Sequence, residues 1–143
     1  MLLVVDFNAV FSALVVKGTT LDVFIRNDKL RKFNFISPEF ILDETISHKS
    51  ELLFLTKLSD EEFNKFFSMI KSQIEIVHSS EFLETLPEAI KLNKKDSPYL
   101  ALAMKKGCPI FSGDKRLRSQ TKVIVYSPKD LLNILGSSEK NLP

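Results

Sequence analysis

The chain has 143 residues, of which 44% are hydrophobic and 27% charged, and its formal net charge is +2. This length and balance are typical of one globular domain and exclude a largely disordered chain. The single cysteine, Cys108, excludes an intramolecular disulfide, and no apolar run reaches the roughly 18 residues of a membrane span, so we expect a cytoplasmic protein that does not contact a membrane.

The first predicted strand is the apolar run of residues 2–5, which ends at Asp6. From residue 8 to residue 16 apolar side chains recur at helical spacing, and Gly18 predicts the end of this helix. The whole run is as hydrophobic as a signal peptide, but Asp6 and Asn8 interrupt it and no basic residue precedes it. We therefore interpret it as internal structure.

Between residues 20 and 72 the sequence predicts one strand and three helices. Thr20 is the expected cap of the first helix, and Ser37 followed by Pro38 is a typical start for the second. Ser59 opens a capping box for the third helix, whose phenylalanine stripe is expected in the core. The predicted elements are a helix at 21–28, a strand at 32–36, a helix from 38 to about 54 and a helix at 60–72.

The remainder of the chain predicts three further strands. Residues 79–92 form either one helix kinked at Pro87 or two short helices that meet there, and Asp96 begins a helix that ends at Gly107. The predicted strands are 74–77, 109–112 and 122–126, and a last helix at 128–136 ends at Gly136. We expect residues 1–136 to form one domain and residues 137–143 to form a flexible tail.

Strands alternate with helices along the chain, which predicts an α/β fold: a three-layer α/β/α sandwich around a parallel sheet of four to five strands. Ligands of such folds bind beyond the carboxyl ends of the strands. Asp6 and Asp114 directly follow predicted strands, and Asp96 begins a helix at the same edge. We expect their carboxylates to meet there, although Asp96 is also suited to capping a helix and the other two to turns.

Carboxylates held together in a cleft repel one another, and a divalent metal ion relieves that repulsion. Oxygen ligands favour Mg²⁺ or Mn²⁺, which activates water and stabilises charge on a phosphate. Asn8 is placed to orient a metal-bound water or Asp6, or alternatively to cap the first helix. The histidines, His48 and His78, and Cys108 are isolated in the sequence, so a structural zinc site is not expected.

A fourth carboxylate is expected from the helix predicted at 38–54. Glu44 follows Phe40 and Ile41 at helical spacing and shares the apolar stripe that they begin, so it should point inward. We therefore place Glu44 ahead of Asp43 as the fourth acid.

Positive charge is concentrated around two of these acids. Residues 94–118 carry seven Lys and Arg against two Asp. Such cations would guide a phosphate backbone to the acids, although a charge run is also typical of a solvated surface. The candidates for RNA binding are Lys94, Lys95, Lys115, Arg116 and Arg118.

Four segments carry a family resemblance: LLVVDFNAVFSAL, SPEFILDETISH, DSPYLALAMKKGCPIFSGDKRL and VIVYSPKDLL. In this order they resemble the PIN-domain family, in particular the VapC-type ribonucleases of toxin and antitoxin pairs and their stand-alone relatives. The third segment is the most specific, because it joins an Asp, an aromatic residue, an Ala-Leu-Ala helix and a strand ending in Gly-Asp-Lys. The resemblance spans nearly the whole chain and implies a PIN-like fold.

The resemblance implies a metal-dependent ribonuclease that holds Mg²⁺ or Mn²⁺ with four acids. By position these acids are Asp6, Glu44, Asp96 and Asp114, and Asn8 matches the polar residue two after the first acid. Many members carry a further acid two residues after the fourth, where this chain has Arg116. This departure argues against a second metal position and indicates a phosphate contact instead.

The implied reaction is hydrolysis of an RNA phosphodiester by a metal-activated water. Asp6, Asp96 and Asp114 would ligate the ion, and Glu44 would hold a water or act as general base. The resemblance also implies two protein partners: an antitoxin that inserts into the acidic crevice, and a second copy of the chain in a homodimer.

Two alternatives stay open. A PIN fold that binds RNA or protein without cutting is favoured by Arg116 and opposed by the four retained acids. A phosphatase of the haloacid-dehalogenase type is less favoured: its opening motif resembles LLVVDFNAV but needs a second Asp where this chain has Asn8.

Overall fold

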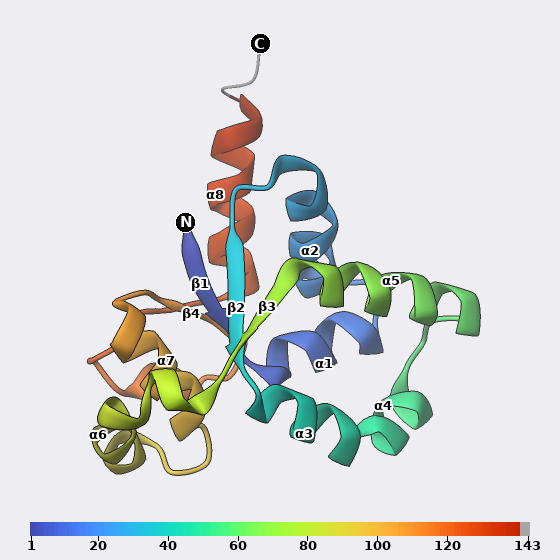
Figure 1. Cartoon of the computed structure of the whole chain (residues 1–143). Coiled ribbons are helices and arrows are strands. Elements are labelled where there is room, and N and C mark those ends of the chain that lie inside the picture. Colours follow the sequence, from blue (N-terminus) through green and yellow to red (C-terminus); the bar gives the residue numbers. More distant parts are fainter. Residues whose placement is uncertain (141–143) are drawn as a thin grey trace.

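The computed structural model describes residues 1–140, with side chains described to residue 136. Its centre is a sheet of five parallel strands in the order β3-β2-β1-β4-β5. The strands are β1 (Leu2–Val5), β2 (Asn34–Pro38), β3 (Ile74–Val77), β4 (Ile110–Phe111) and β5 (Val125–Tyr126). The predicted α/β/α sandwich around a parallel sheet is confirmed (Figure 1).

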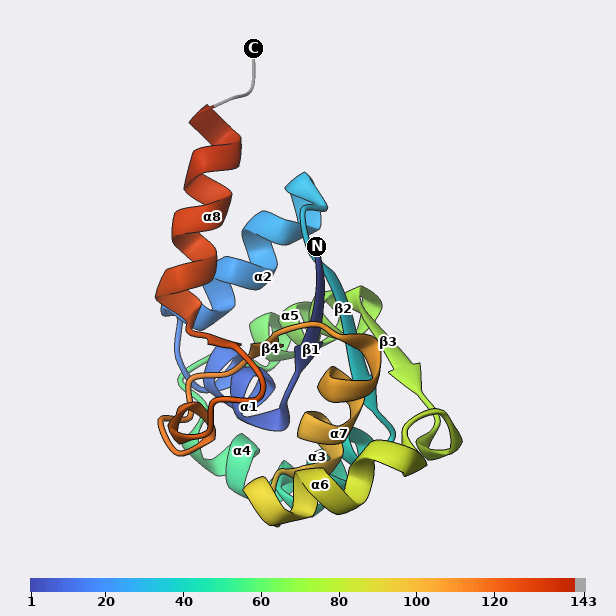
Figure 2. The ribbon, with the colours of Figure 1, turned by 90° about the vertical axis from the view of Figure 1, so that its left-hand side faces the viewer.

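Helices cover both faces of this sheet. They are α1 (Phe7–Val15), α2 (Thr19–Leu30), α3 (Phe40–Ser47), α4 (Lys49–Leu55), α5 (Asp60–Gln73), α6 (Leu86–Leu92), α7 (Ser97–Lys106) and α8 (Pro128–Lys140). Helices α6 and α7 lie on one side, whereas α1, α2 and α5 lie on the other with α8 packed along α2 (Figure 1, Figure 2). All strands run in the same direction, so their carboxyl ends meet at one edge, the lower one in Figure 1.

The central strand explains why an acid is delivered into the interior. Leu3, Val4 and Val5 of β1 are each 0% exposed, because helices cover both faces of the strand. Phe35 of β2 and Phe111 of β4 pack on each other with ring centroids 5.9 Å apart. Asp6, the residue that follows β1, therefore lies inside the protein rather than at the surface.

The predicted helix start at Ser37 is wrong, because β2 continues through Pro38. Residues 37 and 38 pair with β3, and the Ser37 hydroxyl donates a hydrogen bond to the Val5 carbonyl oxygen at 2.8 Å. Sheet pairing thus outweighs the local capping signal, and α3 begins only at Phe40.

The single helix predicted from 38 to about 54 is two helices, α3 and α4. His48 separates them with backbone angles φ −104° and ψ 7°, which are outside the helical region.

Other boundaries also differ from prediction. Helix α2 begins at Thr19, so Thr20 lies inside it and is not its cap. Residues 79–92 form two short 3₁₀ helices, Ser79–Glu81 and Leu83–Thr85, followed by α6, with Pro87 in the first turn of α6 where its missing N–H costs nothing. The strands predicted at 109–112 and 122–126 shorten to β4 and β5.

Helix α8 continues to Lys140, past the predicted end at Gly136. Gly107, which does end α7, has a left-handed φ of 62°, and among the described residues it is the only glycine with positive φ. Gly136 therefore takes no terminating conformation. Residues 141–143 of the predicted tail lie outside the described residues.

Within residues 1–140 no single helix is long and apolar enough to cross a membrane. Helices α1 and α2 meet the length and composition criteria only as a pair, and they are bent by 101° relative to each other.

Candidate active site

The four predicted acids come from distant parts of the chain and line one pocket at the carboxyl edge of the sheet, together with a fifth acid, Glu51. Asp6 follows β1, Glu44 lies on α3, Asp96 precedes α7 and Asp114 follows β4. The pocket has a volume of about 270 Å³. Its other lining residues are Phe7, Asn8, Phe11, His48, Glu51, Lys95, Tyr99 and Arg116.

Asp6 is the most deeply placed acid, with 2% of its surface exposed. One carboxylate oxygen, Oδ1, accepts a hydrogen bond from the Ala9 N–H at 3.0 Å and caps α1. The other, Oδ2, accepts from the Ser112 hydroxyl at 2.6 Å. The pKa of Asp6 is raised to about 7, chiefly by burial; the negative charges of Asp96 and Asp114 also raise it, and its hydrogen bonds from Ser112 and Ala9 lower it.

Asp114 is held by the turn that leaves β4. Its N–H donates to the Ser112 hydroxyl oxygen at 3.0 Å, and its carboxylate Oδ1 accepts from the Arg116 N–H at 2.9 Å. Ser112 therefore contacts both Asp6 and Asp114, and this hydroxyl aligns the end of β4 with the end of β1.

Asp96 occupies the N-cap position of α7, but among the described residues its side chain makes no capping hydrogen bond. The Asp96 N–H donates a hydrogen bond to the Asn93 Oδ1 at 3.1 Å. Burial and the neighbouring charge of Asp114 raise the pKa of Asp96. The alternative role of Asp96 as a helix cap is thus wrong, and its carboxylate is left to the pocket.

Glu44 reaches the pocket through a partner on α7. Its Oε1 accepts a hydrogen bond from the Tyr99 hydroxyl at 2.5 Å, and the Tyr99 oxygen accepts from the Phe7 N–H at 3.3 Å. Burial raises the pKa of Glu44, and the charge of Asp96 adds to this effect. Asp43, the lower-ranked candidate, is exposed and does not line the pocket.

Asn8 also lines the pocket, and its side chain is held close to the chain after β4. A methyl group added at Gly113 would lie 3.4 Å from the Asn8 Oδ1, so glycine leaves the room that this amide occupies. Because Asp6 caps α1, the alternative role of Asn8 as that cap is wrong.

The structure brings two of the five predicted RNA-binding cations to the pocket. Lys95 and Arg116 line it, and the Arg116 Nε lies 3.9 Å from the Asp114 Oδ1. The charge of Lys95 lowers the pKa of Glu44 and Asp96 against the raising effects of burial. The three others, Lys94, Lys115 and Arg118, are exposed outside the pocket lining.

The donor chemistry of this pocket fits a hard divalent cation. Its acidic ligands are carboxylates, and their mutual repulsion and burial leave negative charge that a cation would neutralise. Within residues 1–140, however, no three His, Cys, Asp or Glu side chains converge closely enough to hold an ion as they stand. Asp6, Glu44 and Asp114 accept hydrogen bonds in this arrangement, and each carboxylate oxygen keeps a second lone pair that can bind a metal ion.

A family model for the PIN domain matches residues 4–124. The chain belongs to the PIN-domain family. The match includes all four acids, which lie between residues 6 and 114. PIN domains are generally nucleases that use divalent metal ions, so this chain has a nuclease-type fold. A comparison with curated proteins found no match.

Four further residues of this PIN domain's pocket were not predicted as functional. Tyr99 and Phe11 were given no role from the sequence, Ser112 was expected only to end a strand, and His48 was expected to be isolated. For Ser112 a signal existed, since a polar residue directly precedes Gly113 and Asp114. For Tyr99 and His48 the deciding contacts join segments far apart in sequence, which no local pattern shows, whereas Phe11 meets Phe7 one helical turn away.

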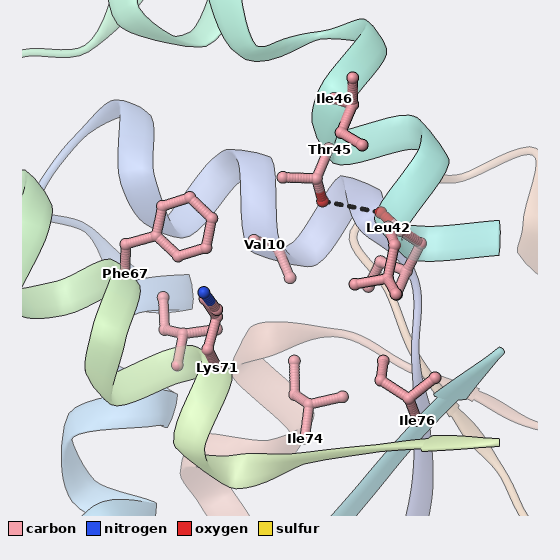
Figure 3. A pocket seen from close by; sticks show the side chains of 10 residues that line it. Val10, Leu42, Thr45, Ile46, Phe67, Lys71, Ile74 and Ile76 are labelled. Atoms are coloured by element: carbon pink, nitrogen blue, oxygen red, sulfur yellow. Dashed lines mark hydrogen bonds between the residues drawn. The ribbon is translucent and has the colours of Figure 1, made fainter. Parts of the chain in front are cut away.

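A larger hollow of about 370 Å³ lies between α1, α3, α5 and β3, away from the acids (Figure 3). Among the described residues its lining is apolar apart from Thr45 and Lys71, and the Thr45 hydroxyl is engaged with the Ile41 carbonyl oxygen at 2.7 Å. No carboxylate of the described residues lines this hollow, whereas all four predicted acids line the smaller, polar pocket.

Proposed function

We propose that this PIN domain is a metal-dependent endoribonuclease that hydrolyses RNA phosphodiester bonds. One observation carries the proposal: the four predicted carboxylates, which come from four separate segments, line a single pocket, with Lys95 and Arg116 beside them. The negative charges of Asp6, Asp96 and Asp114 repel one another, and a bound divalent cation would relieve that repulsion.

The proposed ligands of Mg²⁺ or Mn²⁺ are Asp6, Asp96 and Asp114, with Glu44 completing the set. A bound ion of this kind lowers the pKa of water and stabilises negative charge on a phosphate. The protein contributes orientation. Ser112 and the Ala9 N–H fix the two oxygens of Asp6, so this ligand is held from both sides.

Glu44 is suited to positioning the attacking water and accepting its proton. The Tyr99 hydroxyl holds one of its oxygens, which leaves the other for a water. Burial raises the pKa of Glu44, and a carboxylate with a raised pKa is a stronger base than an exposed one. Tyr99 thereby fixes the direction from which the water attacks.

The cations are proposed to bind the RNA backbone. Lys95 and Arg116 are placed to contact the phosphate at the pocket, whereas Lys94, Lys115 and Arg118 extend this charge over the neighbouring surface. Such contacts release counterions, so RNA binding should weaken steeply as salt concentration rises.

One observation favours the alternative of a PIN fold that binds without cutting. Arg116 contacts Asp114 through both its N–H and its guanidinium, and this cation competes with a metal ion for the same carboxylate. Titration with Mn²⁺ separates the two functions. A nuclease should show a metal-dependent rise in melting temperature that is lost in Asp96→Asn, whereas a metal-independent scaffold should show none.

The cleavage test compares wild type with Asp6→Asn on single-stranded and hairpin RNA in Mn²⁺. Asp28→Asn is the matched control, because Asp28 pairs with Arg31 on the surface of α2, away from the pocket. We expect Mn²⁺-dependent cleavage by wild type and by Asp28→Asn, and its loss in Asp6→Asn. Equal activity of all three proteins would show that the acids do not form the active site.

A role as toxin of a toxin and antitoxin pair stays a prediction from the resemblance. Co-expression with the product of the neighbouring gene tests it. If that protein is the antitoxin, it should form a complex with the PIN domain and suppress the growth defect that the PIN domain causes alone.

A further inference from the structure

Three aromatic rings form one wall of the acidic pocket, and the proposed function assigns them no role. Phe7 is the base of this group and is 6% exposed. The His48 ring stacks on it with a centroid distance of 5.5 Å and an interplanar angle of 23°. Phe11 meets Phe7 edge to face at 5.9 Å. His48 and Phe11 line the pocket together with the four acids.

His48 is held in place without being covered. It lies at the break between α3 and α4, and its Nδ1 lies 3.3 Å from the Glu51 Oε2. Phe7 covers one face of the imidazole, yet 45% of the His48 side chain remains exposed. The ring is therefore fixed in orientation while part of its surface stays open to a ligand.

The aromatic wall and the cationic wall come from opposite parts of the fold. Phe11 lies on α1 and His48 between α3 and α4, whereas Lys95 precedes α7 and Arg116 follows β4. In Figure 1 the first group of elements lies on one side of the lower ends of the strands, and α7 lies on the other. The pocket is thus lined by carboxylates, cations and aromatic rings that come from different elements.

We propose that His48 and Phe11 form a nucleobase-binding site beside the acids, on which one unpaired base of the RNA stacks. The proposal rests on the ribonuclease function proposed above. A nucleotide carries an anionic phosphate and a flat aromatic base, and these two parts match the cationic and aromatic walls. Bases stack well on aromatic side chains, but only when they are not already paired and stacked in a duplex.

A purely structural role predicts different behaviour. If His48 and Phe11 only cover Phe7, their removal lowers stability and affects every RNA equally. If they bind a base, their removal weakens binding of RNA that carries the base and leaves binding of RNA that lacks it unchanged. An abasic nucleotide therefore distinguishes the two roles.

The test measures the equilibrium binding of a single-stranded oligoribonucleotide with Ca²⁺ in place of Mn²⁺, so that binding is read without turnover. A second oligonucleotide has an abasic site next to the cleaved phosphate. If no cleavage is observed, a set of oligonucleotides with one abasic site each, at successive positions, takes its place. The proteins are wild type, His48→Ala, His48→Phe and His78→Ala. His78 is the control because its side chain, 63% exposed, pairs with Glu39 and does not line the pocket.

We expect His48→Ala to raise the Kd of the intact oligonucleotide about tenfold and His48→Phe to restore most of the affinity, since a phenyl ring also stacks. For wild type, one abasic position should raise the Kd by a similar factor, and His48→Ala should bind that abasic RNA no more weakly than wild type does. His78→Ala should behave as wild type.

Two results would overturn the inference: additive effects of His48→Ala and the abasic site, or equal affinity of wild type for single-stranded RNA and for the same strand in a duplex. Neither depends on catalysis. Absence of Mn²⁺-dependent cleavage by wild type would instead contradict the proposed ribonuclease, so the two failures are distinguishable.

Discussion

The Ser112 hydroxyl donates a hydrogen bond to the Asp6 Oδ2 at 2.6 Å, and it accepts one from the Asp114 N–H at 3.0 Å. Asp6 and Ser112 are 106 residues apart in the sequence. This one buried side chain therefore links the ends of two neighbouring strands and sets the spacing of two acids.

Replacement of Ser112 by alanine should disturb Asp6 specifically. In the wild type, the hydrogen bond from Ser112 lowers the pKa of Asp6. Its loss in Ser112→Ala should therefore raise this pKa, so that a smaller fraction of Asp6 is ionised near neutral pH. We expect cleavage at pH 7 to fall about tenfold and to recover in part at higher pH. Kinetics measured from pH 6 to pH 9 check this expectation.

Ser72→Ala is the control, since the exposed Ser72 hydroxyl donates only to the Met69 carbonyl oxygen. It should leave the pH profile unchanged. An unaltered profile in Ser112→Ala as well would mean that this hydroxyl does not tune Asp6.

Replacement of Tyr99 by phenylalanine should affect both stability and activity. The variant removes the hydroxyl that donates to Glu44 and leaves the Phe7 N–H without its acceptor. A buried donor without a partner costs about 1–3 kcal/mol of unfolding free energy. We expect a lower melting temperature and slower cleavage, with Glu44 no longer held in one direction.

The matched control is Tyr126→Phe at the only other tyrosine in the sequence. Urea unfolding and Mn²⁺-dependent kinetics of both variants make the comparison. Equal behaviour of the two would show that the contact between Tyr99 and Glu44 has no role in the site.

The metal-free protein should become less stable as pH rises toward neutrality. Burial raises the pKa of Asp6 from 3.8 to about 7, so between these values the folded state binds more protons than the unfolded state. The contribution of protonated Asp6 to the unfolding free energy is fully present below about pH 4 and is lost as pH rises through 7. Its size is on the order of 4 kcal/mol. The raised pKa values of Glu44 and Asp96 act in the same direction.

Chemical unfolding at pH 5, 6, 7 and 8 in the presence of a chelator measures how the unfolding free energy changes with pH. Asp6→Asn should have a flatter profile and be more stable than wild type at pH 8, because it carries no buried charge. Saturating Mn²⁺ should stabilise wild type most at high pH. A wild-type protein whose stability increases steadily from pH 5 to pH 8 would contradict the assigned pKa direction.

Removal of Arg116 should separate metal binding from RNA binding. The Arg116 guanidinium lies 3.9 Å from the Asp114 carboxylate, so Arg116→Ala frees this acid and should tighten Mn²⁺ binding several-fold. The same change should weaken RNA binding. It should also reduce the slope of log K for RNA binding against log salt concentration by about 1, as expected for one lost phosphate contact.

Arg118→Ala provides the comparison, since Arg118 is exposed outside the pocket lining. It should weaken RNA binding without changing the affinity for Mn²⁺. Calorimetric titration with Mn²⁺ and RNA binding at several salt concentrations give both quantities. Weaker Mn²⁺ binding by Arg116→Ala would indicate that Arg116 supports the acids rather than competing with a metal ion.

The sheet and its acidic edge could be predicted because both depend on short-range patterns. The apolar run that ends at Asp6 is a buried parallel strand, and such strands place the following residue at the ligand-binding edge. Glu44 could be ranked above Asp43 because one helical turn relates it to buried Ile41.

The remaining details depend on long-range packing. Ser37 has strong local signals for a helix cap, yet pairing with β3 and a hydrogen bond to Val5 keep it in the sheet. Tyr99 lies 55 residues from Glu44 along the chain. His48 lies between α3 and α4 and stacks on Phe7 of α1. No periodicity or motif within one segment contains these contacts.

The most direct measurement is the rate of Mn²⁺-dependent RNA cleavage by Asp96→Asn under single-turnover conditions. Asp96 is well suited to this test because its side chain faces the pocket without capping α7, so the substitution removes charge without loosening the helix. Asp22→Asn, which changes an exposed acid paired with Arg26 on α2, is the control for loss of one charge.

Loss of an outer-shell partner of a metal ligand typically costs 10- to 100-fold, so loss of a direct ligand should slow cleavage by about 100-fold or more. We predict this loss for Asp96→Asn. In a chelator, the melting temperature of Asp96→Asn should be equal to that of the control or higher. Cleavage by Asp96→Asn at the rate of wild type and Asp22→Asn would contradict the account.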